Sequence, residues 1–99
     1  MDPASASITE LRSRLTAGEI SPREIVESVA GAIADRDGDL GAYLSCDVEA
    51  ALTAADQADL SLPLGGIPVA IKDNINVQGS PCTCASRFLE NGYLSPYDA

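Results

Sequence analysis

The chain has 99 residues, a net charge of −9 at pH 7 and no histidine. The acidic excess argues against direct nucleic-acid binding by this segment, because phosphates are bound by clusters of lysine and arginine. The lack of histidine excludes His-based triads and most zinc or iron sites, so we expect no metal and no bound cofactor in this chain.

A first short helix is predicted over residues 8–17. Ser7 is placed to cap it, and Glu10, three positions later, reaches back to complete a capping box. Apolar residues then recur on one helical face, and Gly18 is a plausible stop at the C-terminal end.

A second helix is predicted to begin after Ser21, its expected N-cap, with Pro22 at the first helical position. Its apolar stripe ends at residues 36–38, where Gly38 is expected to close the helix. Because the connection to the first helix is very short, we expect these two helices to pack as a helical hairpin.

A third helix is predicted between Asp47, as its N-cap, and about residue 59. Alanines dominate this stretch, which favours a helix and allows close packing against a neighbour. Residues 42–44 before it are expected to be a short extended piece, and Pro63 ends the helical part of the chain.

The most apolar run, residues 64–74, is predicted to contain a buried strand. Ile67, Val69 and Ile71 alternate with other residues in the two-residue period of a strand. Gly65-Gly66 opens the run and Asp73-Asn74 closes it, both with turn chemistry. Beyond it we expect a loop to residue 81, one helical turn over 86–91 and an extended end. A lone strand leaves its backbone groups unpaired, so its neighbours must come from elsewhere.

Lys72, at the end of this predicted strand, is the only lysine in the chain. Apolar surroundings would disfavour its charged form and lower its pKa, which would make it a base near neutral pH. Alternatively, the lysine simply marks where the strand meets water, with its stem lying along apolar surface. The strand pattern alone favours this second role.

The charge is uneven along the chain. Residues 1–60 hold twelve acidic residues and four arginines, whereas residues 61–99 hold three acidic and two basic residues. We interpret the first part as a solvated outer layer and the second as a part meant to be covered. Three cysteines fit no disulfide framework, no signal peptide is apparent, and no apolar stretch has the length of a membrane helix. We therefore expect a cytoplasmic location and no membrane association.

The run GGIPVAIKDNI at residues 65–75 resembles the lysine motif of the amidase signature family. Within that family, residues 83–87, 89–91 and 95–99 are similar to the A subunits of glutamyl-tRNA(Gln) or aspartyl-tRNA(Asn) amidotransferases. The likeness runs without a gap from about residue 64 to residue 99, and less specifically over the helical part before it.

The resemblance implies a triad of a nucleophilic serine, a second serine held by a cis peptide, and a lysine as the terminal base. By position that lysine is Lys72. A serine hydroxyl is a weak nucleophile until a positioned base takes its proton, and serine–lysine variants of the triad are known. The Gly/Ser-rich segment that carries both serines in the family is absent from these 99 residues. We interpret the chain as an N-terminal fragment that is inactive alone.

The fold class expected from the resemblance is α/β. N-terminal helices over 1–60 would precede residues 61–99, which carry the lysine motif and the first strand of a mixed sheet. Together they would make one incomplete domain of an amidase-signature α/β/α architecture.

The resemblance also implies a function and partners. In the family, the A-type chain hydrolyses glutamine, and its ammonia serves a B subunit that uses ATP and Mg²⁺ to convert Glu-tRNA(Gln) to Gln-tRNA(Gln). A small C subunit completes the complex. Two alternatives stay open: a general amidase of the same family acting on small amides, and a non-enzymatic acidic helical interaction module. We assign Asp73 and Asn74 a structural role in the turn after the strand.

Overall fold

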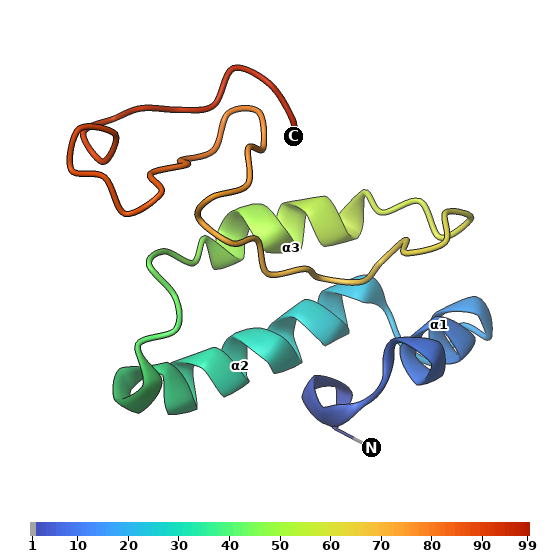
Figure 1. Ribbon diagram of the computed structural model, residues 1–99. Coiled ribbons are helices and arrows are strands. Elements are labelled where there is room, and N and C mark those ends of the chain that lie inside the picture. The colour runs from blue at the N-terminus through green and yellow to red at the C-terminus, as the bar shows by residue number, and fades with distance from the viewer. Residues whose placement is uncertain (1) are drawn as a thin grey trace. The chain divides into compact units, whose positions relative to one another are not determined.

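A computed structural model describes residues 2–99 (Figure 1). In order along the chain these residues form a 3-10 helix, η1 (Pro3–Ser5), and the α-helices α1 (Ile8–Thr16), α2 (Pro22–Leu40) and α3 (Val48–Asp56). The backbone divides into two compact units, a first that ends at Pro68 and a second over Val69–Ala99. No helix in the described part of the chain is long and apolar enough to cross a membrane.

Helix α1 begins as its sequence predicts. Ser7 Oγ accepts the backbone N–H of Glu10 at 3.2 Å, and Glu10 Oε2 accepts the backbone N–H of Ser7 at 2.9 Å. This reciprocal pair satisfies two N–H groups that a helix start leaves free, and it confirms the capping box. The helix ends at Thr16, one residue before the predicted end, and Gly18 follows with φ +74°.

Helix α2 is longer than its sequence predicts. It begins at Pro22, with Ser21 Oγ accepting the N–H of Glu24 at 3.2 Å, as expected for the N-cap. The predicted end at residues 36–38 is wrong, because Gly41 and not Gly38 takes the left-handed conformation that closes the helix, with φ +61°. Asp37 stabilises this end by accepting the N–H of Ala42 at 2.7 Å.

Helix α3 starts where predicted and ends three residues earlier. Asp47 Oδ1 accepts the N–H of Ala50 at 3.0 Å and caps the helix. At the other end, Asp59 Oδ1 accepts both the N–H of Ser61 at 2.9 Å and its hydroxyl at 2.6 Å. The α-helix ends earlier, at Asp56, because Gln57 and Ala58 donate to the carbonyl oxygens of Ala54 and Ala55 in tighter, 3-10-type bonds. The Asx-type turn at Asp59 then prevents the helix from continuing.

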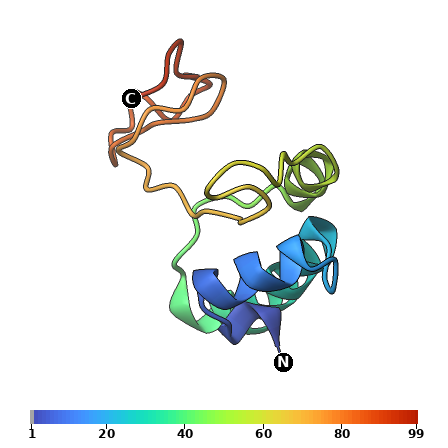
Figure 2. The same cartoon turned by 90° about the vertical axis from the view of Figure 1, so that its right-hand side faces the viewer.

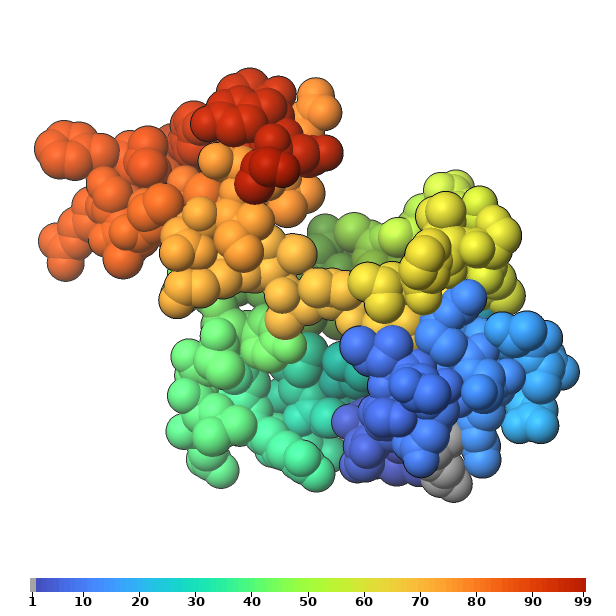
Figure 3. Space-filling model, turned by 45° about the vertical axis from the view of Figure 1, so that its right-hand side comes forward, coloured from blue at the N-terminus to red at the C-terminus, as the bar shows by residue number. Residues whose placement is uncertain are grey.

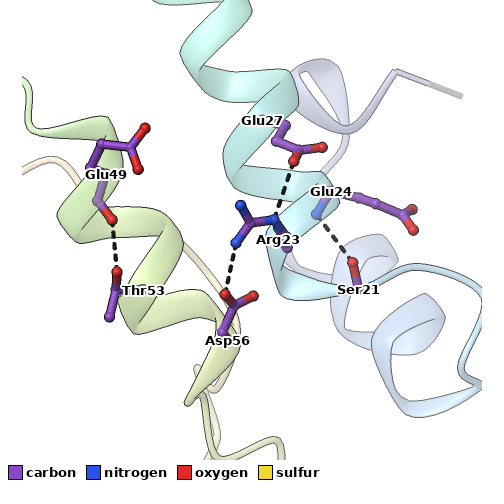
Figure 4. A network of polar contacts seen from close by, with 7 residues as sticks. All are labelled: Ser21, Arg23, Glu24, Glu27, Glu49, Thr53 and Asp56. Atoms are coloured by element: carbon purple, nitrogen blue, oxygen red, sulfur yellow. Dashed lines mark hydrogen bonds and ion pairs between the residues drawn. The ribbon is translucent and has the colours of Figure 1, made fainter.

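Helices α2 and α3 run antiparallel and side by side, as both views show (Figures 1 and 2). Val26 of α2 packs against Leu52 and Ala55 of α3 in one buried cluster. Arg23 Nη1 also reaches Asp56 Oδ2 at 2.7 Å across this pair (Figure 4). Because both side chains are about half exposed, this ion pair contributes no more than about 1 kcal/mol, and the apolar contacts dominate.

The predicted hairpin of α1 and α2 is wrong. Helix α1 crosses the N-terminal end of α2 rather than running along it (Figure 2). Its buried side chains, Leu11 and Leu15, meet Ile25, which is fully buried, in a second cluster. Only the first turns of α2 take part in this contact, so the helix alongside α2 is α3.

The predicted strand over residues 64–72 is not formed, and no segment within residues 2–99 pairs as a strand. The described part is therefore helical rather than α/β, and the extended piece at 42–44 is not a strand either. A strand exists only through hydrogen bonds to a neighbouring strand, and the described residues supply no such neighbour. Consistent with that, Val69 and Ile71 are 64% and 53% exposed, and a space-filling view places this stretch on the surface (Figure 3).

The N-terminal end of this stretch is held by hydrogen bonds within the first unit. Arg12 of α1 donates to the carbonyl oxygens of Gly65 at 2.8 Å and Leu60 at 2.9 Å. A Cβ atom on Gly65 would lie 1.9 Å from the carbonyl oxygen of Asp59, so no other residue fits there without a backbone shift. Glycine at position 65 is thus required by packing.

We predict that Gly65→Ala lowers the free energy of unfolding by about 1–3 kcal/mol, the usual cost of overpacking. Chemical denaturation followed by circular dichroism measures it. Gly31→Ala is the matched control, because it lies in α2 with nothing within 4 Å of the added carbon. Alanine favours helix there, so the control should be neutral or stabilising by up to about 1 kcal/mol. Equal effects of the two substitutions would contradict the close approach at Gly65.

Candidate functional site

Lys72 lies near the start of the second unit, where the chain turns. Its carbonyl oxygen accepts the N–H of Ile75 at 3.0 Å, which closes a turn over residues 72–75. The lysine side chain is exposed to water. Residues 2–99 therefore do not supply the apolar surroundings that a neutral amine requires.

Asp73, the next residue, forms four hydrogen-bonding contacts with residues 82–84. Its carboxylate accepts the backbone N–H of Thr83 at 3.0 Å and also the Thr83 hydroxyl. Its carbonyl oxygen accepts the N–H of Cys84 at 3.1 Å and lies 3.5 Å from the thiol of Cys82. We call these four contacts the Asp73–Thr83 clamp. They confirm the structural role predicted for Asp73, but its partner ten residues away had no signal in the local sequence pattern.

The clamp changes the acidity of Asp73. The Thr83 hydroxyl, and then the Thr83 N–H, stabilise the ionised carboxylate and hold the pKa of Asp73 below its usual value. The thiol of Cys82 is affected in the opposite direction. Its burial, at 4% exposure, and its hydrogen bond with Cys84 raise the pKa of Cys82.

The turn after Thr83 has unusual backbone geometry. Cys84 and Ala85 have φ values of +50° and +63°, in the left-handed region that costs a non-glycine residue about 1–2 kcal/mol. Ser86 donates its N–H to the carbonyl of Thr83 at 2.8 Å, and Leu89 donates to Ser86 at 3.1 Å. The helical turn predicted at 86–91 is thus a series of hydrogen-bonded turns. Strained backbone of this kind is concentrated at functional sites.

Ser95 joins the last residues to the loop that follows Lys72. It is 2% exposed, and its hydroxyl lies 2.6 Å from the carbonyl oxygen of Tyr97 and 3.1 Å from Asn76 Oδ1. The carbonyl oxygen of Ser95 accepts the N–H of Gly79 at 2.8 Å, and its N–H donates to the carbonyl oxygen of Ser80 at 2.9 Å. The burial of Ser95 was not predicted from the sequence. The dipeptide Ser95-Pro96, which is typical of a turn, was the signal that could have indicated it.

Other candidate sites are weaker. A shallow hollow of about 670 Å³ lies in the first unit between α1 and Pro63, and Lys72 does not line it. All three cysteines are free thiols. Within the described residues no three histidine, cysteine, aspartate or glutamate side chains gather as a metal site would require. The turn at Lys72 with its clamp is therefore the best candidate site.

We predict a pH dependence from the lowered pKa of Asp73. Such a group stabilises the folded state above its unfolded pKa of about 3.9, and this contribution is lost as the pH falls through the folded pKa. An NMR titration of the Asp73 carboxyl should show a midpoint below the ordinary value, and Thr83→Val should raise it.

Asp59 is the internal control for this titration, because hydrogen bonds from Ser61 lower its pKa independently. The Thr83→Val substitution should leave the Asp59 midpoint unchanged. An Asp73 midpoint that does not move in the variant would show that the Thr83 hydroxyl contributes nothing to the clamp.

The chain has clear relatives among known proteins. The amidase family profile matches residues 24–99, which include Lys72 and the clamp. The A subunit of glutamyl-tRNA(Gln) amidotransferase from Methylacidiphilum infernorum is 57% identical over 93 residues, which are 94% of this chain and 19% of the relative. The protein of the same name from Akkermansia muciniphila is 50% identical over 99 residues, 100% of this chain and 21% of the relative.

A more distant relative is the protein of the same name from Thermus thermophilus. It is 42% identical over 90 residues, which are 91% of this chain and 19% of the relative. The chain therefore spans about a fifth of the length of the curated relatives it matches.

Proposed function

Because this chain belongs to the amidase family, we propose that it is the lysine-bearing part of the glutamine-hydrolysing A subunit of a tRNA-dependent amidotransferase. The observation that supports the proposal is the 57% identity, over 94% of this chain, to the A subunit of glutamyl-tRNA(Gln) amidotransferase from Methylacidiphilum infernorum. Lys72 and the Asp73–Thr83 clamp both lie within the region that matches the family.

In the proposed mechanism Lys72 is the terminal base. Its neutral amine accepts a proton relayed through a second serine from the nucleophilic serine, whose oxygen then attacks the side-chain amide of glutamine. The proton then returns from Lys72 through the second serine to the leaving nitrogen, so cleavage of the C–N bond releases ammonia and leaves an acyl-enzyme, which water hydrolyses to glutamate and the free serine. The relatives are about five times as long as the part that this chain matches. We assign both serines to the four fifths of such a protein that this chain does not span.

The mechanism requires that Lys72 be removed from water, because an exposed amine is protonated at neutral pH. We propose that residues 64–72 become the first strand of a mixed sheet in an α/β/α domain. The exposed apolar side chains Val69 and Ile71 and the lack of a strand partner within residues 2–99 support this. Pairing with neighbouring strands would cover both side chains and bury the stem of the lysine.

The proposal implies partners. Ammonia released by this protein is used by a B subunit, where ATP and Mg²⁺ activate the glutamyl group of Glu-tRNA(Gln), or the aspartyl group of Asp-tRNA(Asn), and a C subunit completes a cytoplasmic heterotrimer. The net charge of −9 disfavours contact between this segment and the tRNA itself. We therefore assign no tRNA contact to this segment, and we assign glutamine to the A subunit as its substrate.

A general amidase acting on small amides is the second candidate, because the family match is shared by both activities. It would use Lys72 in the same way. The two functions differ in the acceptor of ammonia, so they are separated by whether the enzyme amidates a mischarged tRNA. The third candidate, a helical interaction module, would use α1, α2 and α3 without Lys72.

The test is a chimera in which this chain replaces the matched 93 residues of the Methylacidiphilum infernorum protein, co-produced with the other components of that amidotransferase. We expect glutamine hydrolysis and amidation of Glu-tRNA(Gln). Lys72→Ala should lower kcat for glutamine hydrolysis by about 10²–10⁴, the usual contribution of a general base. Lys72→Arg should be nearly as damaging, because arginine cannot lose its proton in a protein.

Arg87→Ala is the matched control, because Arg87 is the other basic residue of the second unit and is exposed. It should retain kcat within about twofold, which is small beside the loss expected for a base. Normal turnover in either Lys72 variant would exclude this lysine as the base. Hydrolysis of small amides without amidation of Glu-tRNA(Gln) would favour the second candidate.

A further inference from the structure

We propose that Thr83 is a positioning residue for Lys72 and acts through the carboxylate of Asp73. This inference rests on the proposed function and adds to it a residue that does not touch the substrate. Thr83 is eleven positions from the base in sequence, yet it binds the residue that follows the base.

The hydrogen bonds hold the backbone on the C-terminal side of Lys72 at two successive carbonyls. The Lys72 carbonyl accepts the N–H of Ile75 at 3.0 Å, and the Asp73 carbonyl accepts the N–H of Cys84 at 3.1 Å. With both carbonyls held, the peptide planes after Lys72 have little freedom to rotate. Together with the Ile75 contact, the clamp therefore restricts the directions in which the lysine side chain can leave the backbone.

Thr83 provides two of the contacts that orient Asp73. Its N–H donates to Asp73 Oδ1 at 3.0 Å, and its hydroxyl donates to Asp73 Oδ2. A two-point contact to a carboxylate determines its orientation, whereas a single hydrogen bond leaves it free to rotate. Bonds to a charged acceptor are also about twice as strong as those between neutral groups. The hydroxyl is thus the part of the clamp that a side-chain substitution can remove without breaking the backbone contact.

Accurate placement matters here because lysine has a long, flexible side chain. Proton transfer requires the amine to lie within about 2.6–3.2 Å of the group it deprotonates. A displacement of about 1 Å caused far from the reacting atoms can lower a rate by about 10²-fold. Loosening the residue next to Lys72 should therefore reduce kcat and leave binding of glutamine unchanged.

The test compares Thr83→Val with Thr83→Ser in the chimeric protein. Valine keeps the shape and the backbone N–H but lacks the hydroxyl, whereas serine keeps the hydroxyl. We expect Thr83→Val to lower kcat for glutamine hydrolysis by about 10-fold to 10²-fold with KM within about twofold, and Thr83→Ser to retain at least about half of kcat.

A double-mutant cycle with Lys72→Ala separates positioning from a general loss of structure. If Thr83 acts by placing the amine, Thr83→Val should not lower the residual rate of the Lys72→Ala chimera, because no base remains to be placed. If Thr83 only supports the fold, Thr83→Val will lower the rate by the same factor with and without Lys72, and the proposal is overturned.

The outcomes also distinguish this inference from the proposed function. Normal turnover of Lys72→Ala would overturn both. An inactive Lys72→Ala chimera combined with normal kcat in Thr83→Val would overturn the positioning role alone. If Thr83→Val does not yield folded protein, Thr83→Ala takes its place in the same cycle, with the same expected pattern.

Discussion

One carboxylate, that of Asp73, ties the turn after Lys72 to Thr83. Asp73 accepts both polar hydrogens of Thr83 through its side chain and the N–H of Cys84 through its carbonyl. Within Val69–Ala99 there is no regular helix or strand to satisfy the backbone, so such contacts define the path of the chain. The lowered pKa of Asp73 reflects the same interaction, because the hydrogen bonds favour the charged form.

The same kind of contact recurs in the first unit. Ser7, Ser21 and Asp47 begin the three α-helices by accepting backbone N–H groups, and Asp59 closes the turn after α3. Short polar side chains thus decide where elements begin and end. The two apolar clusters that hold α1, α2 and α3 together are small, each built around three buried residues. Local hydrogen bonds at the helix ends thus accompany a small apolar core in this unit.

The proposed chemistry explains why the apolar residues near Lys72 are exposed. A lysine acts as a base only when burial keeps it neutral, so the surface around it has to be covered by other parts of a larger domain. Val69 and Ile71 are the side chains that such a cover would bury. In the proposed role, the clamp holds the backbone at the end of this surface, next to Lys72.

The sequence by itself determined the local features. The caps at Ser7, Ser21 and Asp47 and the family resemblance around Lys72 were predicted correctly, because each depends on residues a few positions apart. The end of α2 was predicted at Gly38, and the structure shows instead that Gly41 takes the left-handed conformation that closes the helix.

Only the tertiary structure decided which elements are neighbours. It showed that α3, and not α1, lies alongside α2, and that the apolar run at 64–72 is not a strand within residues 2–99. It also revealed the pairing of Asp73 with Thr83. The physical reason is the same in each case: a cap is completed by residues within one helical turn, whereas a strand, a helix pair or a clamp needs a partner that is distant in sequence and is chosen by folding.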